Sequence, residues 1–129
     1  MSGLVKKAPK DDIEFLPNAR RIAAAMLDFK AKNIKGFDVR ALTVLTDCIM
    51  MCTVTSEPQL KAVYKGVREA MSEIKVLPLH AEGAFESNWM VLDYGVILVH
   101  FFRESAFEFY GLDSLWGDAP AVDLALDEA

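Results

Sequence analysis

The sequence is poor in the residue types from which catalytic and metal centres are usually built. It has 2 cysteines and 2 histidines, too few for a histidine-built metal site unless other ligands converge on them. It contains no Walker-type glycine-rich loop and no dinucleotide-binding fingerprint. It also lacks the Gly-Ser turn with a nearby Asp-x-Asp pair that holds metal and phosphates in nucleotidyltransferases. We therefore expect a protein that is not an enzyme, with no cofactor and no metal.

The two cysteines, Cys48 and Cys52, lie four residues apart within an apolar segment. A thiol inside an apolar strand lacks the access and the electropositive surroundings that make a cysteine reactive. We predict that both are reduced and fill the core, in preference to a disulfide, a metal site or a nucleophile.

Positive charge is also scarce. Lysine and arginine total 14 against 19 acidic residues, for a net charge of -5. A protein that holds nucleic acid through its phosphates needs a basic face, so little direct nucleic-acid contact is expected. An acidic protein can still reach a ribonucleoprotein by binding its basic proteins.

Long apolar runs and a signal-type N-terminus are absent, which predicts a cytoplasmic protein without membrane contact.

Residues 1–10 carry three lysines and no acid, whereas residues 117–129 carry four acids and no base. We expect a flexible basic tail over residues 1–12, a single domain over 13–117 and an acidic tail over 118–129. The hydrophobic fraction of 53% predicts a filled core and some apolar surface left for a partner, with a homodimer as one candidate.

Apolar periodicity and turn residues predict eight elements in the order αββαβββα, which is a mixed α/β sheet of about five strands with flanking helices. The second long helix has the clearest start, because Ser56 can cap it, Pro58 fits its first turn and Gln59 completes a capping box. The expected elements are a helix within Leu16 to Asn33, strands Phe37 to Leu45 and Asp47 to Val54, a helix from Ser56 to Ile74, strands Leu77 to Ala81, Trp89 to Asp93 and Val96 to Phe102, and a helix from Glu104 to Trp116.

The last two strands form a predicted hairpin with distinct faces. With Tyr94 and Gly95 as a two-residue turn, Trp89 lies opposite His100. One face is wholly apolar and is assigned to the core: Met90, Leu92, Ile97, Val99 and Phe101. The other mixes aromatic, acidic and imidazole groups: Trp89, Val91, Asp93, Val96, Leu98, His100 and Phe102. This second face is either a recognition surface or a face partly covered by a terminal helix. Composition alone favours neither interpretation.

Three segments, taken in order, resemble the ribosomal silencing factor family, RsfS or Iojap. They are Thr46-Asp47-Cys48-Ile49-Met50 with Cys52-Thr53-Val54-Thr55-Ser56; Glu82-Gly83 with Asn88 to Gly95 and Val99-His100; and Phe109-Tyr110 with Leu115 to Ala119. The resemblance covers about Leu16 to Ala119. Where the family usually has Gly-Asp in the hairpin turn, this chain has Gly95-Val96.

The resemblance implies a nucleotidyltransferase-like fold without the active site. It also implies binding to the large ribosomal subunit through large-subunit ribosomal protein fourteen, so that subunit joining is blocked and translation is repressed in nutrient limitation or stationary phase. The residues expected at the contact are Trp89 as anchor, with Asp93, Tyr94, Leu98, His100 and Glu82. The alternatives are a large-subunit assembly factor and a nucleotidyltransferase-like nucleotide binder.

Overall fold

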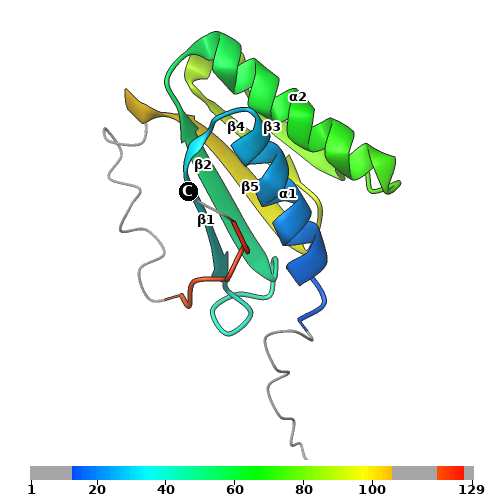
Figure 1. Ribbon diagram of the computed structural model, residues 1–129. Helices are drawn as coiled ribbons and strands as arrows, with labels where there is room; N and C mark the ends of the chain where they lie inside the picture. The colour runs from blue at the N-terminus through cyan, green and yellow to red at the C-terminus, as the bar shows by residue number, and fades with distance from the viewer. Residues whose placement is uncertain (1–12, 106–118, 127–129) are drawn as a thin grey trace, which may run out of the picture.

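The computed structural model describes residues 13–105 and 119–126, in which two helices cover one face of a five-stranded mixed sheet (Figure 1). Strand order is β1-β2-β5-β4-β3; β2 and β5 are parallel and the other neighbours antiparallel. This confirms the predicted fold class. The elements are α1 Leu16–Asp28, β1 Lys32–Asp38, β2 Cys48–Val54, α2 Glu57–Glu73, β3 His80–Ala84, the 3-10 turn η2 Phe85–Ser87, β4 Trp89–Asp93 and β5 Ile97–Arg103.

Two predicted features fall largely outside the described residues. They are the basic tail over 1–12 and nearly all of the helix from Glu104 to Trp116. Within the described part, neither helix is long and apolar enough to cross a membrane.

The start of α2 is built as the sequence predicts, with one difference in its hydrogen bonds. Ser56 Oγ accepts the Gln59 backbone N–H at 3.2 Å. Gln59 Oε1 accepts from the N–H of Thr55, at 2.9 Å, and not from that of Ser56. Its amide nitrogen also donates to the carbonyls of Phe29 and Lys30, both at 3.1 Å. The capping glutamine therefore ties the start of α2 to the end of α1.

Strand β2 is an interior strand of the sheet, as predicted from its apolar sequence. All seven residues from Cys48 to Val54 are buried, because β1 and β5 flank the strand and both of its faces are covered. Both cysteines are buried and free. Burial raises the pKa of the Cys48 thiol to about 12 and raises the pKa of Cys52 as well. Their predicted place in the core is confirmed.

The prediction for the first strand is wrong in position. Helix α1 ends at Asp28, earlier than expected, and β1 occupies Lys32–Asp38, so the predicted strand from Phe37 to Leu45 is mostly loop. The chain turns after β1 because Asp38 Oδ1 accepts the backbone N–H of Arg40. The apolar residues that suggested a strand here are exposed in that loop: Leu42, Val44 and Leu45.

The hairpin register is shifted by two residues from the prediction, because the two-residue turn is Gly95-Val96. The Tyr94 N–H donates to the Ile97 carbonyl at 2.9 Å, and Gly95 has φ +87°, which glycine adopts without strain. Trp89 therefore lies opposite Phe102, with the other pairs shifted to match. A shift of two keeps every side chain on its own face. The predicted core face is confirmed, since all five of its residues are buried.

Residues 119–126 extend the sheet beyond β1, in contrast to the acidic tail expected there (Figure 1). Asp38 N–H donates to the Pro120 carbonyl at 2.9 Å, and Val122 N–H donates to the Gly36 carbonyl at 2.8 Å. Leu124 joins the core beneath α1, and Arg20 donates to the Asp123 carbonyl at 3.0 Å. The apolar side chains between the acids explain the difference, because they bury themselves against β1.

We expect Leu124→Ala to lower the free energy of unfolding by about 2 to 3 kcal/mol, since Leu124 is 7% exposed and its loss leaves a cavity. The matched control is Leu45→Ala, at a residue 86% exposed, which we expect to change stability by less than about 0.5 kcal/mol. Urea unfolding followed by circular dichroism measures both. If both substitutions lower the free energy of unfolding by the same small amount, residues 119–126 do not pack in the folded state.

Candidate partner-binding site

The sheet face away from the two helices carries the predicted contact residues, and we call it the outer face. Residues paired across strands share a face, and the register aligns Glu82, Val91 and His100 in one row across β3, β4 and β5. A second row holds His80, Asp93 and Leu98, and a third holds Ala84, Trp89 and Phe102. Five of the six predicted residues thus meet on this face.

Three stacked rings form the centre of the outer face. The Trp89 ring stacks on Phe102 with centroids 5.7 Å apart, and on His100 at 6.0 Å. The rings of His100 and Phe102 lie 5.7 Å apart and are nearly parallel, at 6°. The Trp89 indole N–H donates to His100 Nδ1 at 3.2 Å. Aromatic pairs of this kind restrict each other's rotamers, so Trp89 is held in a defined orientation.

His100 is held in its neutral form beneath Trp89. Desolvation by burial lowers the pKa of His100 from 6.5 to about 4. Because Nδ1 accepts the indole hydrogen bond, the neutral ring carries its proton on Nε2. His100 therefore acts as a positioning residue for the tryptophan.

The outer face is buried over β2 and part of β5 and exposed toward β3. Met51 and Thr53 of β2 and Phe102 of β5 are buried. In contrast, Trp89 is 42% exposed and every residue of β3 is exposed. One part of the outer face is therefore closed to a partner, and another part is accessible. The accessible surface is formed by β4 and β3.

Asp93 supports the hairpin turn as well as the outer face. Its Oδ1 accepts the Gly95 N–H at 2.8 Å, and its backbone carbonyl accepts the Leu79 N–H at 2.7 Å. The carboxylate is only partly exposed. Substitutions that remove its acceptor oxygen therefore disturb the turn, whereas an amide preserves the acceptor.

Tyr94 is not on the outer face, and the structure does not place it beside Trp89 with the other predicted contact residues. Its side chain is buried in the core cluster on the helix side of the sheet. Burial raises the pKa of Tyr94 to about 12, while the positive charge of Arg68 acts in the opposite sense. Its hydroxyl is buried without a hydrogen-bond partner among the described residues. The side chain of Tyr94 points inward because it follows Asp93 in an alternating strand.

The remaining two predicted residues lie at opposite borders of this surface. Leu98 is partly buried against a small cluster that includes Val39 and Ile49. Glu82 is exposed, and its carboxylate is 3.0 Å from the Nε2 of His80, which is also exposed. Leu98 thus supports the face, whereas Glu82 offers a charge at the rim.

The sequence interpretation missed exposed apolar residues at one end of the sheet. Val96 is exposed at the hairpin tip, and its carbonyl accepts the backbone N–H groups of Asp47 and Cys48. This places the tip beside the loop that carries Leu42, Val44 and Leu45. The signal that could have located the loop is Asp38-Val39-Arg40, an aspartate-initiated turn within the predicted strand.

The chemistry available on the outer face is recognition. Among residues 13–105 and 119–126 there is no group of three or more His, Cys, Asp or Glu residues arranged to hold a metal ion. The face instead offers an exposed aromatic ring supported from below, with carboxylates beside it. Such surfaces suit a protein partner whose contact is anchored on one large side chain.

We expect the contribution of His100 to stability to depend on pH. The unfolded chain binds more protons than the folded one between pH 6.5 and about 4, so this contribution is present above pH 6.5 and is lost as the pH falls. The stability advantage of wild type over His100→Gln should therefore shrink from pH 7 to pH 4. Denaturant unfolding at several pH values measures it, with the exposed His80→Gln as control. A constant difference would contradict a neutral, desolvated His100.

Comparisons with known proteins agree on one family. The sequence profile of the family described as "Ribosomal silencing factor during starvation" matches residues 12–129. The ribosomal silencing factor RsfS of Bacillus subtilis is 32% identical over 105 residues, covering 81% of this chain and 89% of the relative. That of Treponema pallidum is 34% identical over 102 residues, covering 78% and 90%.

The fold agrees as well. A crystal structure of a Chromobacterium violaceum protein has a TM-score of 0.75 and 29% sequence identity, and the match covers 81% of this chain and 88% of that one. The profile spans nearly the whole chain and the relatives match over most of their length, so this chain belongs to the ribosomal silencing factor family.

Proposed function

We propose that this protein binds the large ribosomal subunit in the cytoplasm and blocks its joining with the small subunit, which represses translation in nutrient limitation or stationary phase. The contact is made with large-subunit ribosomal protein fourteen, through the open half of the outer face. Occupying a subunit interface requires bulk and affinity only, so the protein acts without catalysis and without a cofactor.

The observation that carries the proposal is the exposed Trp89 on its stack of His100 and Phe102. A tryptophan that is exposed and also fixed in orientation loses little conformational freedom when a partner covers it. Residues of this type dominate binding energy at the centre of protein interfaces. The partly buried Val91 and the carboxylates of Asp93 and Glu82 surround it on β4 and β3.

Charge supports the same partner class. The chain has a net charge of -5, and Asp93 and Glu82 lie on the outer face, Glu82 at its rim. Ribosomal proteins that bind ribosomal RNA need basic surfaces. Opposite charges on the two partners accelerate association and orient the encounter.

We expect Trp89→Ala to weaken binding to purified large subunits at least about tenfold, because it removes the aromatic anchor. The matched control is Ile74→Ala at the end of α2, since Ile74 is 39% exposed and Trp89 is 42% exposed. Co-sedimentation with large subunits measures binding, and subsequent addition of small subunits measures joining. Circular dichroism confirms that both variants are folded.

The sedimentation experiment separates the alternatives. If wild type pellets with large subunits but leaves joining unaffected, the silencing mechanism is wrong and a role in large-subunit assembly takes its place. If wild type does not pellet, ribosome binding itself fails for this chain. If Ile74→Ala weakens binding as much as Trp89→Ala, the contact lies elsewhere.

We expect Asp93→Asn to keep the fold and weaken large-subunit binding several-fold. The amide oxygen still accepts the Gly95 N–H, while the charge facing a basic partner is lost. The wild-type affinity should fall more steeply with salt than that of the variant. Sedimentation over a salt series measures this, and identical salt dependence of the two proteins would exclude Asp93 from the contact.

A further inference from the structure

A groove runs between α2 and the β3 region on the helix side of the sheet, opposite the outer face. Its volume is about 610 Å³, within the range of binding sites for small molecules and peptide side chains. The residues lining it come from α2, the segment after it, η2 and β4: Tyr64, Lys65, Arg68, Glu69, Ser72, Leu77, Pro78, Phe85 and Met90. Tyr64, Phe85 and Met90 provide apolar surface within the groove.

The groove exists because β3 presents almost no side chains toward α2. Its two positions on this face are Ala81 and Gly83, which pair with Leu92 and Met90 of β4. Gly83 has φ +100°, and a Cβ there would collide with the Trp89 carbonyl oxygen, so only glycine fits. All five residues of β3 are exposed, so the helices leave this part of the sheet uncovered.

The same strand is an open edge of the sheet. The opposite edge, β1, is paired with residues 120–122, whereas β3 is the last strand and pairs only with β4 within the described part of the chain. The Leu79 N–H donates to the Asp93 carbonyl of β4. Because the Asp93 carbonyl faces β3, its ladder partner His80 and, two residues on, Glu82 point their N–H groups toward β4. By the alternation of antiparallel ladders, the N–H groups of Ala81 and Gly83 point away from β4. They are available to an added strand.

A stripe of positive charge borders the groove. Lys61, Lys65 and Arg68 follow each other at i, i+4 and i+7 on α2 and are all exposed. Lys61 lies over the Phe85 ring at 5.5 Å, and Arg68 over the Tyr64 ring at 5.8 Å. Lys61 also pairs with Glu57 at 3.9 Å, but no carboxylate among the described residues forms a salt bridge with Lys65 or Arg68.

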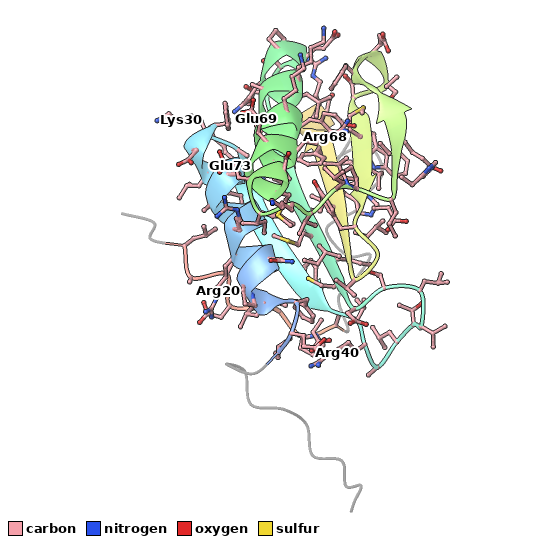
Figure 2. The ribbon with its side chains drawn as sticks, turned by 90° about the vertical axis from the view of Figure 1, so that its right-hand side faces the viewer. Arg20, Lys30, Arg40, Arg68, Glu69 and Glu73 are labelled. Carbon is pink, nitrogen blue, oxygen red and sulfur yellow. The ribbon has the colours of Figure 1, made fainter. Side chains whose placement is uncertain are left out.

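The position of Arg68 agrees with this charge distribution. Figure 2 shows Arg68 on the side of α2 toward the strands and Glu73 on the side toward α1, where Glu73 accepts from Arg21 at 2.8 Å. One acid, Glu69, lines the groove beside the two cations. The groove is therefore locally positive in a chain whose net charge is -5.

We propose that the β3 edge and this groove form a second docking site, for an extended acidic peptide segment of a protein partner. The segment adds to the sheet as a strand beside β3 and places alternate side chains in the groove, where its carboxylates meet Lys65 and Arg68. Backbone hydrogen bonds supply affinity in this recognition mode, and the groove supplies specificity. The groove lies on the opposite face of the sheet from Trp89, and Lys65 and Arg68 take no part in the proposed ribosome contact.

The test uses the full chain and a fluorescein-labelled peptide of about eight residues, the length of an ordinary strand, in which glutamate alternates with valine. Fluorescence anisotropy measures binding, and a peptide with lysine in place of glutamate is the matched control. We expect the glutamate peptide to bind at least about tenfold more tightly than the lysine peptide. Amide exchange followed by NMR should show slower exchange at Ala81 and Gly83 when the glutamate peptide is bound.

Two variants test the two halves of the site. Lys65→Glu with Arg68→Glu reverses the exposed charges, and we expect at least about tenfold weaker peptide binding with large-subunit binding unchanged. Ala81→Pro removes an outward N–H of the edge strand, where proline is tolerated, and should weaken peptide binding. Ala81→Ser keeps the N–H and is its control. Thermal unfolding checks that each variant is folded.

Several outcomes would overturn the proposal. The proposal is wrong if the glutamate peptide does not bind at about 1 mM. It is also wrong if the protein binds the lysine peptide with the same affinity as the glutamate peptide. Peptide binding without slower exchange at Ala81 and Gly83 excludes strand addition. Binding of a uridine oligonucleotide that is lost in the charge-reversed variant, in place of peptide binding, assigns the basic stripe to nucleic acid.

Discussion

The parallel pairing of β2 with β5 is the constraint on which the rest of the structure depends. It joins seven consecutive residue pairs, from Cys48 with Ile97 to Val54 with Arg103. Two parallel strands need a crossover between them, and here that connection contains α2, β3 and β4. The helix covers the inner face of the sheet, while the two strands return to extend its edge beyond β5. The groove and the outer face are thus both products of one connection.

The two sides of the sheet differ in the side chains that they carry. On the inner face, apolar residues of β2, β4 and β5 pack beneath α1 and α2 into one core. On the outer face, the register brings Trp89, His100 and Phe102 into a stack whose lower rings are desolvated. The buried rings hold the exposed one. The orientation of Trp89 is therefore fixed by the packing of the sheet.

The two edges of the sheet also differ, and the chain's own C-terminal segment causes the difference. Residues 120–122 pair with β1, and Leu124 anchors them in the core. Natural proteins usually cover or interrupt sheet edges, because an open edge pairs with other chains. Strand β3 is short and carries charged residues on its outer face, yet it remains uncovered beside a groove. An open edge in a protein that covers its other edge is consistent with use by a partner.

The sequence by itself determined the types of the described helices and strands, the interior position of β2, the start of α2 and the core face of the hairpin. These follow from local signals: a fully apolar run, the cap formed by Ser56 and Gln59, and strict alternation in β4 and β5. It also placed Trp89, Asp93, Leu98 and His100 on one face, because a two-residue error in register preserves parity. Only the tertiary structure decided the position of β1, the burial of Tyr94 and the packing of residues 119–126. Each depends on contacts between segments distant in the chain, where burial against a neighbour, and not local propensity, sets the free energy.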